Sequence, residues 1–317
     1  MTEATFVAQD LGHQAAKLMH HILGTGPIRV DYIPVGVMTW KFVVTDAGGS
    51  EYILRIYPAG RSDIVDVEPD VLRRCRRAGL CVAEVIADSR SGPHAEFSYI
   101  VYRRIPGKRL TLVLESLALR AKNHLAGEIT QQLAMLDGLE MTGYGELHDC
   151  FHGKALAWNE FIDEAFRHGS EALHRNSLLP GSLLKRIAVL ENRTGDFMPD
   201  MAPRLVWADI NTDNILVDDE GGLTGLIDFE SCLSGDGLLT LGYCAALYGR
   251  SGLAELLVSA YPKPIGPSEL VLIDWYTVVR LLRIAPYHAS GRLPTGHAFA
   301  PLLSTFAGFE SALRRLT

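Results

Sequence analysis

Three polar residues around one predicted hairpin, Asp209, Asn214 and Asp228, have side chains suited to binding a metal ion and a phosphate. Two short apolar runs flank the Asp- and Gly-containing segment 218–222, a pattern that predicts two strands joined by a tight turn. Asn214 stands before the first run and Asp228 after the second, so closing the hairpin brings them close together. An amide and a carboxylate oxygen at neighbouring strand ends suit Mg²⁺, which takes few side-chain ligands besides phosphate oxygens.

Asp209 precedes Asn214 by five positions and is predicted to face an attacking hydroxyl group. Phosphoryl transfer requires in-line positioning, cancellation of phosphate charge and a carboxylate that takes the proton of the acceptor. Two metal ligands and a base at this spacing form a kinase signature. The alternative is an acidic surface hairpin whose Asp and Asn side chains cap turns, and we keep that interpretation for Asp219 and Glu220 at the turn tip.

This stretch resembles a known family. Asp-x-x-x-x-Asn, a strand, a turn, a strand and Ile-Asp-Phe-Glu at 227–230 are similar to the motif of aminoglycoside phosphotransferases and related small-molecule kinases. The resemblance implies a protein-kinase-like fold, with Asp209 as the catalytic base and Asn214 and Asp228 as the Mg²⁺ ligands. It further implies ATP or GTP as the phosphate donor.

The chain departs from the family pattern at two positions beneath the predicted catalytic loop. Trp207-Ala208 stands where the family usually has His-Gly, and Thr240 stands near a position that is often acidic. In kinase-like folds these two regions brace each other, so their joint replacement indicates a repacked brace. The residues expected to carry the chemistry remain.

Composition bounds the class of protein. The chain of 317 residues, with 48% hydrophobic and 21% charged residues, is long enough for two lobes with a sizeable core. A net charge of −7 argues against a nucleic-acid partner and tolerates cationic substrates. Five scattered cysteines favour free thiols in a reducing cytoplasm over disulfides or a zinc site. We expect a cytoplasmic protein without a membrane partner, present as a monomer or weak homodimer and acting on a small-molecule substrate.

The expected fold class is α+β. The resemblance implies that a small lobe over 1–104, with an antiparallel sheet, binds nucleotide and that a larger, mainly helical lobe over 105–317 carries the catalytic and substrate-binding residues. The breaker pair Pro106-Gly107 marks the boundary region. In the first lobe, residue patterns predict a helix over 6–23 and three strands over 28–34, 41–45 and 52–57. A fourth strand is entered through 79–86, and a fifth covers 97–102.

Arg55 is a single charge within a strand of large apolar residues, and a buried cation needs a partner. Glu68 is the predicted partner, at the start of a helix that has Pro69 in its first turn. The resemblance implies that Arg55 grips nucleotide phosphates while Glu68 holds it. The alternatives are a surface charge on an edge strand and a helix N-terminal carboxylate favoured by the dipole.

The remaining nucleotide contacts are expected from backbone groups. Gly36 lies where the family has a glycine-rich loop over the phosphates, although an ordinary tight turn explains it equally well. Arg103 and Ile105 belong to the predicted hinge, whose amide and carbonyl groups meet the purine. Side-chain identity there does not separate ATP from GTP.

Four carboxylates are candidates for binding a cationic acceptor. Asp213, Glu230 and Asp236 surround the motif and favour cations through the local field. Asp274 interrupts an apolar helix over 269–285, where it lines a pocket, pairs with Arg280 or is exposed.

We therefore expect a kinase that phosphorylates a hydroxyl group of a small, amine-bearing molecule, as antibiotic phosphotransferases do. A metabolic kinase of the choline, homoserine or fructosamine type is the alternative enzyme. A nucleotide-binding pseudokinase is the alternative from another class, favoured by Trp207, Thr240 and the thin loop at Gly36. Retention of Asp209 argues against it, since a binding-only protein has no use for the base.

Overall fold

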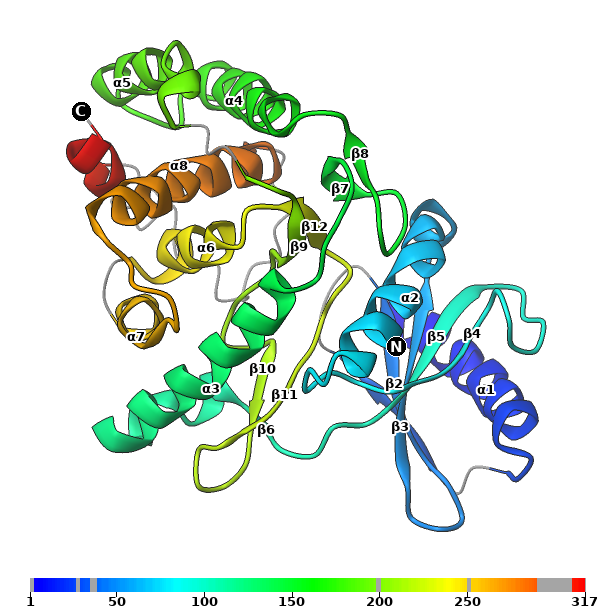
Figure 1. Cartoon of the computed structure of the whole chain (residues 1–317). Helices are drawn as coiled ribbons and strands as arrows, with labels where there is room; N and C mark the ends of the chain where they lie inside the picture. The colour runs from blue at the N-terminus through cyan, green and yellow to red at the C-terminus, as the bar shows by residue number, and fades with distance from the viewer. Residues whose placement is uncertain are drawn as a thin grey trace. The chain divides into compact units, whose positions relative to one another are not determined.

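A computed structural model describes the chain over residues 3–26, 29–34, 39–197, 201–249, 252–289 and 310–316. It divides into two compact units (Figure 1). The first comprises Met1–Pro106 together with Gly225–Glu230, and the second comprises Gly107–Thr224 and Ser231–Thr317.

The first unit is built on a five-stranded sheet with the order β1-β2-β3-β5-β4. All neighbouring strands are antiparallel, and they overlap the predicted runs. The Asp46 carboxylate stabilises the β2–β3 turn, because it accepts hydrogen bonds from the amides of Gly48 and Ser50. The strands are β1 (Arg29–Ile33), β2 (Trp40–Thr45), β3 (Glu51–Tyr57), β4 (Val85–Asp88) and β5 (Ser98–Arg103).

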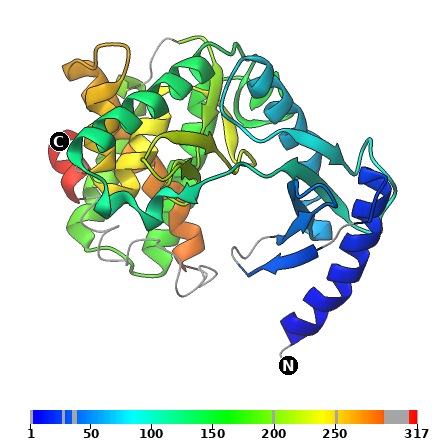
Figure 2. The same cartoon turned by 90° about the horizontal axis from the view of Figure 1, so that it is seen from below.

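Two helices complete this unit. The amphipathic helix α1 (Glu3–Leu23) runs alongside the strands in Figure 2, and Leu18 and Met19 on it join Phe42 and Leu54 of the sheet in one buried cluster. Helix α2 (Asp63–Arg77) packs against β4 and β5.

Helix α2 starts earlier than the sequence predicted. It begins at Asp63, so Glu68 and Pro69 lie inside the helix rather than at its start. The acidic residues Asp63 and Asp66 in its first turn suit the positive end of the helix dipole. Pro69 lacks the N–H that an interior position would donate, and burial of the face that carries Val71 offsets that loss.

The first unit extends beyond the expected boundary after residue 104. It includes residues 105 and 106 and also the distant segment 225–230. The amide of Leu226 donates to the Cys81 carbonyl at 2.8 Å, and Val82 and Leu226 form a parallel bridge. Gly225 permits this approach, since a Cβ there would stand 3.1 Å from the same carbonyl oxygen and 2.7 Å from Ile105.

The second unit is mainly helical and carries two small sheets. One has the order β8-β7-β12-β9 and the other β11-β10-β6. Residues 232–240 form β12 and the start of α6, and β12 pairs with both β7 and β9. The strands are β6 (Lys108–Arg109), β7 (Tyr144–Leu147), β8 (Gly153–Ala155), β9 (Arg204–Trp207), β10 (Ile215–Val217), β11 (Leu223–Leu226) and β12 (Cys232–Gly235).

Helix α8 (Pro267–Ala289) lies at the centre of this unit and packs against α4 and α6, as its apolar sequence predicted. Glycines allow close approach: a Cβ at Gly242 would stand 2.4 Å from Tyr276 Cβ, and one at Gly169 would stand 2.5 Å from the Leu282 carbonyl oxygen. The other helices are α3 (Leu119–Asp137), α4 (Trp158–Arg175), α5 (Gly181–Glu191), α6 (Leu238–Tyr248), α7 (Leu253–Ala260) and a last one over 310–316. Short 3-10 turns are η1 (Ala59–Arg61), η2 (Leu110–Leu112), η3 (Leu114–Ser116) and η4 (Thr194–Phe197).

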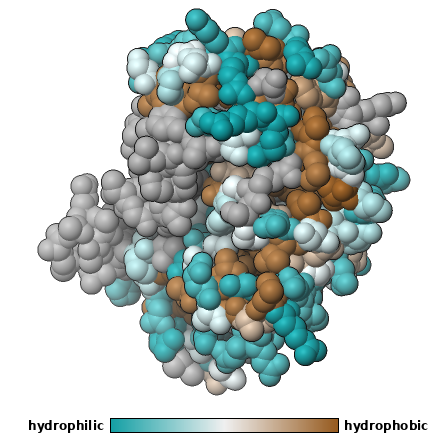
Figure 3. All heavy atoms as spheres, turned by 90° about the vertical axis from the view of Figure 1, so that its left-hand side faces the viewer, coloured by the Kyte–Doolittle hydropathy of each residue, from teal (hydrophilic) through white to brown (hydrophobic). Residues whose placement is uncertain are grey.

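Hydrophobic and hydrophilic residues are interspersed on the face drawn in Figure 3. Across the described part of the chain, no helix is both long enough and apolar enough to cross a membrane.

Candidate active site

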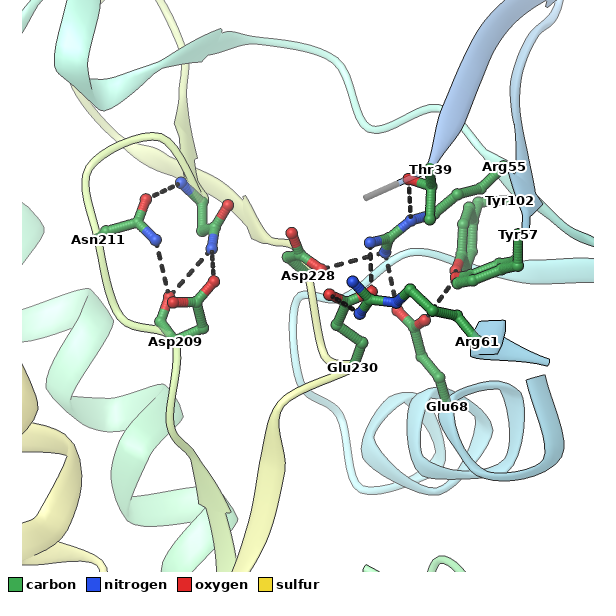
Figure 4. A network of polar contacts seen from close by, with 11 residues as sticks. Thr39, Arg55, Tyr57, Arg61, Glu68, Tyr102, Asp209, Asn211, Asp228 and Glu230 are labelled. Atoms are coloured by element: carbon green, nitrogen blue, oxygen red, sulfur yellow. Dashed lines mark hydrogen bonds and ion pairs between the residues drawn. The ribbon is translucent and has the colours of Figure 1, made fainter. Parts of the chain in front are cut away.

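The loop between β9 and β10 holds the candidate base. Asn211 stabilises it in the manner of an Asx turn: its Oδ1 accepts from the amides of Asp213 and Asn214 at 2.9 and 3.1 Å. Its Nδ2 donates to the Asp209 carbonyl at 3.1 Å (Figure 4). Sequence reasoning missed Asn211, although an Asn between two motif residues is itself a signal for such a turn.

Asn214 is buried and is hydrogen-bonded to the candidate base. Its Nδ2 donates to the Asp209 carbonyl at 3.0 Å and to Asp209 Oδ2 at 2.8 Å. These bonds use the donor side of the amide, and its oxygen accepts no hydrogen bond within the described chain. An amide oxygen oriented in this way is a suitable ligand for Mg²⁺.

The second oxygen of the base has a cationic neighbour that sequence reasoning assigned elsewhere. Arg280 Nη2 on α8 lies 3.5 Å from Asp209 Oδ1. Its guanidinium also stands over the Tyr243 ring, 4.8 Å from the centroid, and its buried Nε has no hydrogen-bond partner in the described structure. Arg280 therefore faces the base with unused donor capacity.

The interpretation of Asp274 as a partner of Arg280, or as an exposed residue, is wrong. Asp274 is buried, and its Oδ2 accepts from Arg315 Nε at 2.7 Å. Six residues along an α-helix turn the side chain by about 240°, so positions 274 and 280 project from different sides of α8.

The predicted repacked brace beneath the loop is present. Thr240 Oγ1 on α6 donates to the carbonyl of the fully buried Trp207 at 3.0 Å. Farther along α6, Tyr248 Oη accepts from the Thr212 amide at 2.8 Å and donates to Thr212 Oγ1 at 3.2 Å. Helix α6 therefore anchors both the end of β9 and the loop that follows it.

Arg55 is the centre of a charged cluster in the first unit (Figure 4). Its Nη1 lies 3.5 Å from Glu68 Oε1, which confirms the predicted pairing. The same Nη1 donates to Asp228 Oδ1 at 3.1 Å, and Nη2 donates to Glu230 Oε2 at 2.5 Å. Nε donates to Thr39 Oγ1 at 3.2 Å. The pairing that the sequence predicted is therefore one part of a three-carboxylate cluster.

Arg61 extends this cluster, because its Nη2 donates to Glu230 Oε1 at 2.8 Å. Both oxygens of Glu230 are thus bound by arginines. Arg61 lies in the short turn η1 just after β3, and the sequence carries no local pattern that distinguishes it from the other arginines nearby.

Burial and the neighbouring charges shift the pKa values of Glu68 and Asp228 in opposite directions. Burial raises the pKa of Glu68 to about 7, although Arg55 and a hydrogen bond from Tyr57 oppose the rise. Burial also acts to raise the pKa of Asp228, but attraction to Arg55 and Lys41 outweighs it, so that this pKa is lowered. Asp228 therefore remains an anion, as a metal ligand must.

Asp228 has a left-handed backbone conformation, with φ of 65°. Non-glycine residues rarely adopt this conformation, and when they do the strain often marks functional sites. The pairs that Arg55 and Arg61 form with Glu230, two residues later, help to hold this turn in place.

The hinge candidates lie at the end of β5 and just beyond it. The amide of Arg103 donates to the Glu84 carbonyl at 2.8 Å, and its Nε donates to the Glu84 carboxylate at 2.8 Å. The next amide, of Arg104, donates to the Glu51 carbonyl at 3.0 Å. Purine contact by the half-buried Ile105 stays a prediction, and Gly36 lies outside the described residues.

The structure gives the other two acceptor-site candidates intramolecular partners. Asp213 Oδ1 lies 3.2 Å from Arg109 Nη1. Asp236 is half-buried and accepts from Tyr276 Oη and from the Leu238 amide, each at 2.9 Å, and burial raises its pKa. Binding of an external amine by either carboxylate stays a prediction.

A sheet unit with a buried arginine–glutamate pair, and a helical unit with Asp-x-x-x-x-Asn before a hairpin, define a protein with a kinase-like fold. Residues 35–262 match the model of the APH family, described as the phosphotransferase enzyme family. The chain belongs to this family, and it is a phosphotransferase.

Solved structures of similar fold include two aminoglycoside phosphotransferases and a kinase. Aminoglycoside phosphotransferase APH(4)-Ia has 19% identity and a TM-score of 0.74, with 96% of this chain and 99% of that chain covered. The GDP complex of aminoglycoside 2'-phosphotransferase-IIIa has 16% identity and a TM-score of 0.68, with coverage of 96% and 99%. A putative fructosamine-3-kinase from Haemophilus somnus 129PT has 12% identity and a TM-score of 0.64, with coverage of 94% and 96%. No curated protein matches the sequence.

Proposed function

We propose that this chain is a magnesium-dependent kinase that transfers the γ-phosphate of ATP or GTP to a hydroxyl group of a small, amine-bearing molecule. The observation that most directly supports this proposal is the hydrogen bonding of Asn214, whose side-chain amide nitrogen donates to the backbone and side chain of Asp209. One short loop thus holds a carboxylate base and leaves an amide oxygen for a metal ion. A surface hairpin that merely caps turns has no need for this arrangement.

Each motif residue has a separate role in this proposal. Asn214 Oδ1 and the Asp228 carboxylate would hold Mg²⁺, which when bound neutralises phosphate charge. Asp209 accepts the proton of the acceptor hydroxyl. As this proton leaves, the hydroxyl oxygen of the acceptor bonds to the γ-phosphorus, and the bond between that phosphorus and the departing nucleoside diphosphate breaks. Arg280, beside Asp209 Oδ1, limits the orientations open to that carboxylate.

The fold relatives support a nucleotide donor, since their structures are described as complexes with AMP-PNP, ADP or GDP. For the acceptor, one relative is described with hygromycin B and another as a putative fructosamine-3-kinase. An amine-bearing acceptor fits the net charge of −7. A metabolic kinase of the fructosamine type is the second candidate, because one fold relative is described as a putative fructosamine-3-kinase.

The direct test is a nucleotide-consumption assay with ATP and GTP against aminoglycosides, peptide antibiotics, amino alcohols and glycated amines. We expect nucleoside diphosphate release that depends on Mg²⁺ and on one acceptor class, and that Asp209→Asn abolishes. An acceptor class can then be assigned by mass spectrometry of the phosphorylated product. Nucleotide binding without consumption for any acceptor would favour the pseudokinase alternative.

A further inference from the structure

Lys41 lies directly opposite Arg55 in the β2–β3 pair. Directly opposed residues of an antiparallel pair project from the same face of the sheet, so both cations belong to one face. The neighbouring Phe42 projects the other way and is buried in the core cluster. The face that carries the charged cluster therefore has a second cation, which sequence reasoning did not consider.

Arg55 has little capacity left for a ligand. Its side chain is 6% exposed, and Nε, Nη1 and Nη2 all have partners. A guanidinium has five N–H groups, and contacts with Thr39, Glu68, Asp228 and Glu230 engage about four of them. Its role in the first unit is to hold three carboxylates together.

Lys41 has the opposite character. It is half-buried, and its ammonium group forms no hydrogen bond or ion pair within the described chain. Burial lowers its pKa and repulsion from Arg55 adds to the effect, while Asp228, Glu230 and Glu68 act to raise it. An ammonium has three donors, and within the described chain all of them remain available beside an acidic cluster.

We propose that Lys41, rather than Arg55, is the side chain that contacts the phosphates of the donor nucleotide, and that Arg55 is a positioning residue for Asp228 and Glu68. This rests on the proposed function. A lysine is a compact point charge that binds phosphate oxygens well, whereas a guanidinium suits several fixed carboxylates. The two tasks expected of Arg55 are thereby divided between two opposed residues on neighbouring strands.

The test is calorimetric titration of the purified full chain with Mg-ATP, Mg-ADP, Mg-GTP, Mg-GDP, adenosine and guanosine. The variants are Lys41→Met, Lys41→Arg and the matched control Lys17→Met, which removes an exposed lysine from α1. Lys41→Met should weaken binding of the preferred di- and triphosphate by about tenfold to a hundredfold, the loss of one charge-assisted hydrogen bond. Nucleoside binding should be unchanged, Lys41→Arg should recover part of the affinity, and Lys17→Met should match wild type.

Two results would overturn this assignment in distinguishable ways. If wild-type protein binds nucleotide and Lys41→Met, with an unchanged melting temperature, binds it equally well, Lys41 does not contact the phosphates. If wild-type protein binds none of the nucleotides, the proposed function fails and the assignment fails with it. Should Lys41→Met lower the melting temperature, the polar variant Lys41→Gln replaces it, and the same comparison of phosphorylated and unphosphorylated ligands decides.

Discussion

Replacement of Glu68 by glutamine should change how stability depends on pH. Glu68 is 2% exposed, receives a hydrogen bond from Tyr57 at 2.8 Å and lies 3.5 Å from Arg55. Burial raises its pKa from 4.5 to about 7 in the folded protein. Between these values the folded state holds a proton that the unfolded state has lost. The free energy of unfolding contributed by Glu68 must therefore fall as pH rises through this window.

The size of the effect follows from the shift. A difference of about 2.5 pH units corresponds to roughly 3 kcal/mol, at about 1.4 kcal/mol per unit. Below pH ~4.5 the contribution is fully present, and above pH ~7 no more is lost. Glutamine keeps the shape and a hydrogen-bonding group but does not titrate. From pH 5 to pH 8, the free energy of unfolding of the wild type should therefore fall by a few kcal/mol relative to that of Glu68→Gln.

Urea unfolding followed by circular dichroism at pH 5, 6, 7 and 8 measures this difference. Glu84→Gln is the control, because the Glu84 side chain is 40% exposed and its hydrogen bond with Arg103 lowers its pKa. Replacing Glu84 should change the slope of the unfolding free energy against pH with the opposite sign, and this change should occur at lower pH. A wild-type to Glu68→Gln difference that stays constant from pH 5 to 8 would refute the reasoning, since Glu68 would then be ionised throughout.

Three further substitutions test the proposed site. Asp209→Ala should lower turnover by ~10²–10⁴ with nearly unchanged nucleotide affinity, because it removes a general base, and equal loss of both would contradict the role. Asp228→Ala should abolish the Mg²⁺ dependence of nucleotide binding in calorimetry with and without the ion, and wild-type affinity for Mg-nucleotide would exclude it as a ligand. Arg280→Met should lower turnover without changing nucleotide affinity, because Asp209 Oδ1 loses the cation 3.5 Å away, and Arg280→Lys should restore part of the rate. Unchanged turnover in Arg280→Met would mean that the pair does not position the base.

The sequence by itself determined the features that depend on neighbouring residues. Apolar runs predicted the strands that form β2 and β3, and an apolar stretch predicted the helix α8. The spacing of Asp209 and Asn214 predicted the loop, because five residues are too few to adopt many arrangements. The Arg55–Glu68 pair was predicted in two parts: an arginine in an apolar strand needs an anion, and the family resemblance implied that a Glu on the next helix supplies it.

Only the tertiary structure decided the contacts between residues far apart in the chain. Asp228 and Glu230 reach Arg55 across 173 and 175 positions, and no local pattern encodes that distance. Arg280 contacts Asp209 rather than Asp274 because packing of α8, and not its sequence, sets which side faces the loop. The pKa of Glu68 depends on burial beside Arg55, which exists only once helix and sheet have packed together.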